Sequence, residues 1–383
     1  MSMKRAGEYI RQPTGYRAFI PALLPPKPSV KFSSELQTLL SKADRALARL
    51  DGVVTVLPNP ELFIAMYVKK EALLSSQIEG THASLEGVLE FEADLTPKED
   101  IDDIKEVVNY IKALDYGIEK LKTFPMSLRL IKEIHKILIK GTRGMHKTPG
   151  EFRRTQNWIG PPGASLNEAT FVPPPPGMVL ELMGNLEKFI HSKDNIPSLI
   201  KIALIHSQFE TIHPFLDGNG RIGRLLITFY LYWMNILSKP LLYLSFYFKK
   251  NRAEYYDLLM KVRKEAVWEE WIRFFLKGIG EVSEEATNTA RKIIKLKDDL
   301  ITKLYENSIS SIYAVKLIDL LFKIPLISTN DIIHKFNVSG VSANKLIKKF
   351  EKIGILKEMS GKQRYRKYLF TDYVEIIKRG TEI

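Results

Sequence analysis

The sequence predicts a mainly α-helical protein whose last part folds as a smaller unit. Apolar residues recur at helical spacing from about residue 33 to 300, and no stretch alternates regularly enough for a large sheet. The 383 residues are 45% hydrophobic and 26% charged, which are ordinary globular proportions and exclude a fibrous or wholly disordered chain. A chain of this length is expected to form two or three domains.

The first segment, residues 1–32, is expected to form a proline-rich arm. Five prolines between positions 13 and 28 forbid a continuous helix there, because proline lacks the N–H that a helix interior needs. We expect an extended arm that lies on the surface of the following domain.

Residues 33–300 are expected to form the helical body. Ser33 and Ser34 are candidate N-caps of its first helix. Further amphipathic segments are 61–79, 83–92, 99–122, 126–140, 177–192, 196–212, 219–236, 251–264 and 267–300. Gly, Pro and Asn interrupt the pattern at 144–176, where the segment ATFV fits one arm of a small hairpin.

One apolar run, residues 225–238, resembles a membrane span only superficially. It is shorter than the roughly 20 residues that a span needs, and Arg221 and Arg224 precede it directly. A helix that is hydrophobic all round is more simply the buried centre of a large domain. We therefore predict a core helix and no membrane contact.

Residues 301–383 have the pattern of a winged helix-turn-helix. Three short helices are expected at 313–323, 330–336 and 342–354, followed by two strands joined by a turn at Ser360–Gly361. From residue 316 onward there are 14 Lys or Arg against 7 Asp or Glu, so this part holds +7 of the chain's formal +13. DNA and a protein partner remain open as alternatives, because winged helices serve both.

Cysteine is absent, which excludes disulfides, thiolate nucleophiles and cysteine-ligated zinc. The seven histidines form no cluster at ligand spacing, so no structural metal is expected. Without a disulfide framework or an apparent N-terminal signal, the cytoplasm is the expected location.

The chemistry is concentrated in HPFLDGNGRIGR, residues 213–224. Gly218 and Gly220 permit backbone conformations that bring free N–H groups together at the start of the apolar helix, where they can bind an anion. Arg221 and Arg224 lie three residues apart on one face of that helix and suit a multiply charged phosphate.

Two further side chains complete the set. Asp217 supplies a hard oxygen ligand for Mg²⁺, and His213 can exchange a proton near neutral pH. Taken singly, the His-Pro-Phe segment is more simply a loop whose polar groups are hydrogen-bonded, and Gly-Asn-Gly is more simply a turn. Two arginines on a helix are more simply a solvated face. The combination of these pieces within twelve residues, at the mouth of a buried helix, indicates phosphoryl or nucleotidyl transfer.

This segment resembles the full signature of the Fic family, H-x-F-x-D/E-G-N-G-R-x-x-R. Phe215 and Asn219 occupy two further fixed positions of the pattern. The resemblance extends through GEFRRTQNWIG, NEATFVPPPP, LLYLSFYF and NRAEYYDLL, which covers roughly residues 60–280. It implies a Fic-type helical bundle with a small β-hairpin flap, whose catalytic domain would span 33–300.

The implied activity is adenylyl transfer (AMPylation) from ATP to a Ser, Thr or Tyr hydroxyl of a target protein or of the chain itself. On this resemblance His213 is the general base and Asp217 holds Mg²⁺, while Phe215 packs the loop into the core. The implied ATP-binding residues are Gly218, Asn219, Gly220, Arg221, Ile222, Gly223, Arg224, Tyr255 and Tyr256. The implied flap, which would align the target chain, comprises Ala169, Thr170, Phe171 and Val172. Tyr255 and Tyr256 remain open to the alternative of being core residues.

A second motif, SSQIEG at 75–80, matches the inhibitory pattern of the same family, S/T-x-x-x-E-G/N. Ser75, Glu79 and Gly80 occupy its fixed positions, within a helix expected at about 65–80. By itself, Glu followed by Gly is a plain helix end. The resemblance implies that Glu79 pairs with Arg224 and blocks the γ-phosphate of ATP, and that the same Glu can orient a water that removes AMP.

Two alternatives stay open at this point. The chain could be a DNA-binding regulator whose Fic body senses a nucleotide, as the basic tail suggests. Some relatives transfer phosphocholine or phosphate, although both arginines suit a triphosphate donor. The sequence leaves a homodimer open and does not identify the target protein.

Overall fold

The computed structural model describes residues 5–55, 60–161, 163–359, 361 and 366–382. It is mainly helical, as predicted, with two small antiparallel sheets. The helices of the body are α1 (Ser34–Thr55), α2 (Pro60–Ile78), α3 (Leu85–Glu92), α4 (Ile101–Leu121), α5 (Leu128–Leu138), α6 (Pro176–His191), α7 (Ser198–Ile212), α8 (Asn219–Trp233), α9 (Ser245–Lys250), α10 (Arg252–Glu265) and α11 (Trp268–Glu306). A 3₁₀ turn spans Leu166–Glu168.

The N-terminal segment is a β-hairpin, where the sequence predicted only an extended arm. Strands β1 (Gly7–Arg11) and β2 (Arg17–Pro21) pair antiparallel, with Tyr9 opposite Phe19. Phe19 is buried, and its ring lies edge-on to that of Tyr9. The hairpin was missed because its apolar side chains are few and the prolines that follow it dominate the local pattern.

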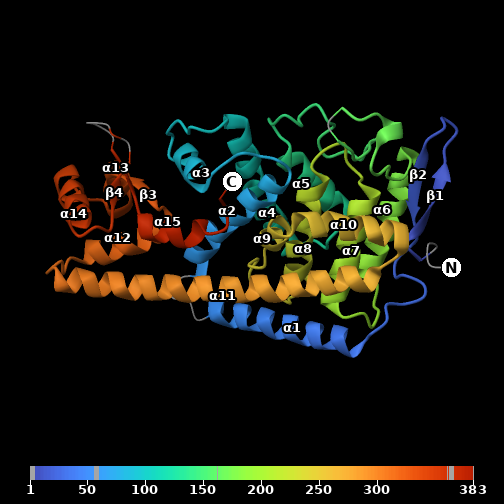
Figure 1. Cartoon of the computed structure of the whole chain (residues 1–383). Coiled ribbons are helices and arrows are strands. Elements are labelled where there is room, and N and C mark those ends of the chain that lie inside the picture. The colour runs from blue at the N-terminus through green and yellow to red at the C-terminus, as the bar shows by residue number, and fades with distance from the viewer. Residues whose placement is uncertain (1–4, 56–59, 162, 360, 362–365, 383) are drawn as a thin grey trace.

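Helices α7 and α8 form the centre of the body, with α2, α4, α5, α6 and α11 around them (Figure 1). Every side chain from Leu199 to Ile212 on α7 is buried, including those of His206 and Glu210. Helix α8 is buried along most of its length, which confirms that the apolar run after Arg224 is core. Within the described ranges, no helix combines the length and apolar content that crossing a bilayer would need. The cytoplasmic location stays a prediction.

Helix α11 is the long axis of the molecule (Figure 1). It continues to Glu306, past the domain boundary predicted at residue 300, and α1 packs along it. The helix therefore connects the body directly to the C-terminal part of the chain, which lies at the opposite end of the molecule from the N-terminal hairpin.

The C-terminal unit comprises residues 312–382. Its elements are α12 (Ile312–Lys323), β3 (Leu326–Ser328), α13 (Thr329–Phe336), α14 (Gly340–Lys352), β4 (Lys357–Glu358), β5 (Lys367–Leu369) and α15 (Thr371–Lys378). The strand order is β3-β5-β4, with both pairs antiparallel. The three predicted helices are present, whereas most of the predicted turn near residue 360 lies outside the described residues. The winged-helix assignment stays a prediction.

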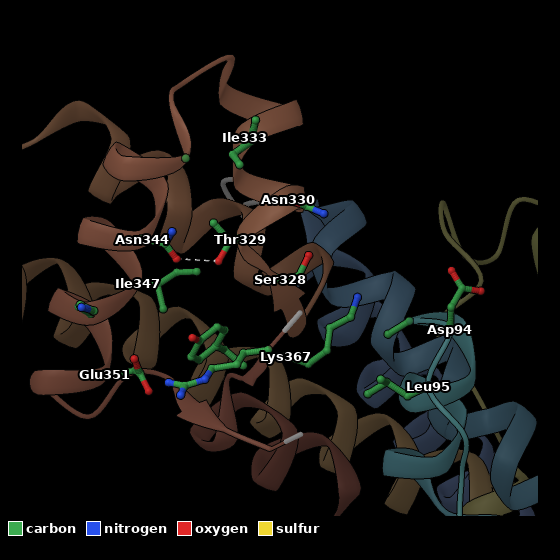
Figure 2. Close-up of a pocket in the computed structure, with 15 residues that line it drawn as sticks. Asp94, Leu95, Ser328, Thr329, Asn330, Ile333, Asn344, Ile347, Glu351 and Lys367 are labelled. Carbon is green, nitrogen blue, oxygen red and sulfur yellow. Dashed lines mark hydrogen bonds between the residues drawn. The ribbon is translucent and has the colours of Figure 1, made fainter. Parts of the chain in front are cut away.

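A hollow of about 810 Å³ separates this unit from the connection between α3 and α4. Figure 2 shows Asp94 and Leu95 on the body side, facing Ser328 and Lys367 across the opening. Helix α14 borders the hollow with Asn344, which hydrogen-bonds to Thr329 on α13. The C-terminal unit is therefore open on this side and contacts the body mainly through α2 and α11.

Candidate active site

The predicted catalytic loop connects α7 to α8 and is fixed by two left-handed backbone positions. His213 ends α7 with φ of 50°, and Gly218 precedes α8 with φ of 76°. Between them, the Asn219 side chain accepts from Phe215 N at 2.8 Å and donates to Phe215 O at 2.9 Å. The Asn219 amide thus holds the loop in shape, whereas the sequence assigned it to phosphate binding.

A histidine that the sequence did not single out supports the same loop. His135, on α5, stacks on the buried Phe215 ring with centroids 3.8 Å apart. Its Nδ1 accepts from Gly150 N at 2.9 Å, so Nε2 carries the proton that it donates to Asp217 O at 3.0 Å. Burial lowers the pKa of His135 to about 4, which keeps the ring neutral. Phe215 therefore packs the loop into the core, as predicted.

His213 is held in the loop through its backbone. Its carbonyl accepts from the buried Arg153 Nε at 2.9 Å. Among the described residues, His213 Nδ1 is buried without a hydrogen-bond partner. Burial, and then the positive charges of Arg263 and Arg153, lower the pKa of His213 to about 3. The ring is therefore a neutral imidazole, which is the form that a general base requires.

Arg224 on α8 and Glu79 at the end of α2 form the predicted ion pair. Arg224 Nη2 lies 2.6 Å from Glu79 Oε1, and Arg224 also donates to Ser75 Oγ at 2.8 Å and Ser75 O at 2.9 Å. Burial opposes the ionisation of Glu79, but the attraction of Arg224 outweighs it and the pKa of Glu79 is lowered. Gly80, with φ of 95°, then turns the chain out of α2.

The Glu79 carboxylate lies directly on the first turn of α8. A β-carbon at Gly220 would collide with Glu79 Oε1, so only glycine leaves room for the carboxylate there. Backbone N–H groups at the start of a helix have no partners within the helix and attract anions. Glu79 therefore places its carboxylate beside the first turn of α8 and on Arg224.

Arg221 is held by a different acidic group, which the sequence did not identify. Its Nη1 lies 3.3 Å from Glu106 Oε2 on α4, and its Nη2 lies 3.5 Å from Asp217 Oδ1. Both Arg221 and Glu106 are buried, while 41% of the Asp217 side chain is exposed. Asp217 Oδ1 also accepts from Gly218 N at 2.6 Å. Asp217 thus presents a carboxylate at the rim of the site, next to the first motif arginine.

A further acid, Glu210, is buried beneath α8. It lies one turn before His213 on α7, and a β-carbon at Gly223 would collide with Glu210 Oε1. Burial raises the pKa of Glu210 to about 7, with Arg224 opposing the shift. Gly223 thus serves close helix packing, and the neighbouring Ile222 side chain is buried in the core.

The predicted flap is partly anchored. Phe171 and Ile159 exchange two backbone hydrogen bonds, of 2.9 and 3.0 Å, and the Arg263 guanidinium lies 3.9 Å from the Phe171 ring centroid. On the other edge, Val172 O accepts from Phe19 N of β2 at 2.9 Å. Ala169 and Thr170 remain toward the surface. The N-terminal hairpin therefore already pairs with one end of the flap.

The two predicted aromatic residues near the nucleotide base differ in their surroundings. Tyr255 is buried, stacks on Phe248 and shares a 2.9 Å hydrogen bond with His206 Nε2. It is therefore a core residue, the alternative that the sequence left open. Tyr256 is 40% exposed and stays a candidate contact for a ligand.

Comparison with known proteins agrees with this arrangement. Residues 37–119 match the family model described as Fic/DOC family N-terminal, and residues 125–231 match the model described as Fic/DOC family. Together the two models span α2, the loop between α7 and α8, and most of α8.

Curated relatives of the chain are named protein adenylyltransferases. A probable protein adenylyltransferase of Aquifex aeolicus is 27% identical over 57% of this chain and 61% of its own length. Protein adenylyltransferase Fic of Drosophila grimshawi is 31% identical over 54% of this chain and 41% of its own length. The chain thus covers less than two thirds of either relative.

Among solved structures, a Fic family protein from Desulfovibrio desulfuricans G20 is similar in fold. Its TM-score is 0.59 at 19% identity, and the match covers 89% of this chain and 97% of that one. A form of Fic-1 from C. elegans matches with a TM-score of 0.51 at 19% identity, over 68% of this chain and 74% of that one.

Proposed function

This chain belongs to the Fic/DOC family, and from that premise we propose that it is a protein adenylyltransferase that moves AMP from ATP to a hydroxyl side chain of a protein. The observation that carries the proposal is the placement of Glu79 on Arg224 and over Gly220. Two buried arginines and a helix N-terminus form a site for several phosphate groups, and a carboxylate of this chain occupies it.

In the transfer step, the hydroxyl oxygen of the target attacks the α-phosphorus of ATP. His213 takes the hydroxyl proton, a bond forms between that oxygen and the phosphorus, and the bond to the β-phosphate breaks to release pyrophosphate. Anionic phosphates bound beside His213 would raise its pKa from about 3 and so favour the protonated ring that the step produces. Arg221 and Arg224 would stabilise the leaving β- and γ-phosphates.

Mg²⁺ is the proposed cofactor, held by Asp217. Asp217 would be the one protein ligand of the ion, because its carboxylate is partly exposed at the rim of the site. Among the described residues, no three His, Cys, Asp or Glu side chains gather as a metal site, so the other ligands would be phosphate oxygens and water. When bound, the ion supplies positive charge that offsets the charge of the phosphates.

Glu79 is the proposed autoinhibitory residue. Its carboxylate neutralises Arg224 and repels a γ-phosphate, so ATP could not bind with its α-phosphate aligned for attack. The same carboxylate could orient a water against a protein-bound AMP, which is the reverse reaction implied by the family resemblance. Relief of inhibition therefore requires Glu79 to leave Arg224.

The test uses ATP labelled on either the α- or the γ-phosphate, with Mg²⁺ and a cell lysate as the source of targets. Glu79→Gly should transfer the α-label to protein at least tenfold faster than wild type, and should not transfer the γ-label. Transfer of the γ-label would identify a kinase-like reaction and contradict the proposal, as would equal, background-level transfer by both proteins.

A DNA-binding regulator with a nucleotide-sensing body is the second candidate. Exposed lysines on α14, including Lys345, Lys348 and Lys349, support it. A salt-dependent mobility shift of a DNA fragment by the full chain would favour this function. Absence of a shift at low salt would exclude it.

A further inference from the structure

The inhibitory motif contains a residue that binds the C-terminal segment of the chain. Gln77 lies on α2 between Ser75 and Glu79, and its Nε2 donates to Thr381 O at 3.0 Å and to Ala83 O at 3.1 Å. Its Oε1 accepts from Lys249 Nζ at 2.8 Å. Gln77, two residues before Glu79, thus hydrogen-bonds to Thr381 and Lys249, which lie far away in the sequence.

The segment that reaches Gln77 consists of residues 378–382, which we name the C-terminal strap. Thr381 is buried, and both its N–H and its hydroxyl donate to Lys378 O, at 2.8 and 2.6 Å. Lys249 on α9 also donates to Glu382 O at 2.6 Å. The strap is therefore an ordered turn fixed to α2 and α9 by its own backbone carbonyls.

Gly380 sets how closely the strap approaches the body. Its φ is 85°, and a β-carbon at this position would collide with the Phe246 ring on α9. On the opposite side, Lys378 Nζ lies 3.4 Å from the Glu86 carboxylate on α3. In Figure 1 the C-terminal end lies beside α2 and α3, well inside the body.

The strap is continuous with the C-terminal unit. It follows α15, which packs on α11 and α2, and α15 follows β5 of the three-stranded sheet. The rest of the unit is separated from the α3–α4 connection by the hollow that Asp94 and Lys367 border (Figure 2). A displacement of the unit would therefore be passed to α2 through α12, α15 and the strap.

We propose that the C-terminal strap holds the last turn of α2 in place and thereby keeps Glu79 on Arg224, so that displacing the strap activates AMP transfer. This inference rests on the proposed function. Helix α2 ends at Ile78, and terminal helical turns fray unless other contacts hold them. Arg224 binds Glu79 from the body side, and the strap binds Gln77 from the other side.

The size of the effect follows from the contacts that are lost. A net hydrogen bond shifts a local equilibrium by a factor of about five. Loss of the Thr381–Gln77 bond, together with the Glu382–Lys249 bond, should therefore raise the population with Glu79 displaced by about 5- to 25-fold. The rate of AMP transfer should rise by the same factor while that population is small.

Gly380→Val tests the inference by pushing the strap away from Phe246. Its matched control is Gly354→Val, in the same unit, where φ is 71° and no atom lies within 4 Å of the added β-carbon. We expect Gly380→Val to transfer AMP from α-labelled ATP at least fivefold faster than wild type, and Gly354→Val to match wild type. Lys249→Ala should act in the same direction as Gly380→Val, and Lys250→Ala, its exposed neighbour, should not.

Two further measurements separate this inference from the proposed function. Hydrogen exchange of the backbone amides of residues 76–80 measures how often the end of α2 opens, and it does not depend on AMP transfer. This exchange should be faster in Gly380→Val but not in Gly354→Val. In the Glu79→Gly background, Gly380→Val should add nothing to the rate. Unchanged hydrogen exchange in Gly380→Val would overturn the proposed role of the strap. So would a Gly380→Val protein that is no more active than wild type while Glu79→Gly is active. An inactive Glu79→Gly would instead overturn the proposed function.

Discussion

The first turns of α8 and helix α14 both concentrate positive charge, but they hold it in opposite ways. Arg221 and Arg224 are buried and each faces a carboxylate, Glu106 or Glu79. The lysines of α14 are exposed. Burying a guanidinium costs free energy unless it is paired, whereas an exposed lysine costs almost nothing. The proposed nucleotide site therefore uses buried, paired arginines, while the exposed lysines are equally compatible with solubility.

The largest effect should come from the imidazole at the end of α7. In the Glu79→Gly background, His213→Ala should lower the rate of AMP transfer by about 10²–10⁴-fold, because the attacking hydroxyl loses its base. ATP affinity, measured by calorimetry, should change little. Transfer that persists at the parent rate would remove His213 from the chemistry.

A smaller effect should distinguish the buried arginine from an exposed lysine. In the same background, Arg224→Ala should raise the KM for ATP by about 10²-fold, because two charged hydrogen bonds to phosphate are lost. Lys348→Ala on α14 serves as the control and should leave KM unchanged. If both variants change the KM for ATP equally, then being buried and paired does not distinguish a nucleotide-binding arginine from a surface lysine.

The third effect concerns stability. Glu71 on α2 is buried, accepts from Tyr110 and Ser245 at 2.9 and 2.5 Å, and has its pKa raised to about 7 by burial, against the pull of Arg224. The folded state therefore holds a proton that the unfolded state releases above its ordinary pKa, so the contribution of Glu71 to stability falls by about 2 kcal/mol as pH rises from 5 to 7. The buried, neutral imidazoles of His135 and His213 shift stability in the opposite direction over this range. The measurement is therefore the free energy of urea unfolding of wild type minus that of Glu71→Gln, which should fall by this amount. A difference between wild type and Glu71→Gln that stays constant from pH 5 to 7 would show that Glu71 is ionised in the folded state.

The smallest effect should come from the C-terminal surface. Replacing Lys345 and Lys348 together with Ala should change AMP transfer less than twofold, because neither touches α2, α9 or the strap. A tenfold change in the rate of transfer from α-labelled ATP would show that the charge of α14 influences the active site. The buried arginines of α8 and the exposed lysines of α14 would then not differ in their effect on the reaction.

The helices of the body were predictable because each buries a continuous apolar face, and the catalytic loop was predictable because its residue types are rarely combined. The first sheet and the short helix α9 were missed, since five or six residues give too little periodicity, and α15 was missed as well. The supporting side chains His135, Glu106 and Glu210 were missed for another reason. Each acts through contacts with a distant helix, and sequence spacing does not encode such contacts.

The most direct measurement is the intact mass of the purified Glu79→Gly protein after incubation with ATP and Mg²⁺, alone and with a lysate fraction. If the Glu79 carboxylate occupies the phosphate site, the variant should gain the mass of one AMP on itself or on a partner, and wild type should gain little. Unchanged masses for the variant and for every partner would contradict the account, because the freed site would then not be used for adenylyl transfer.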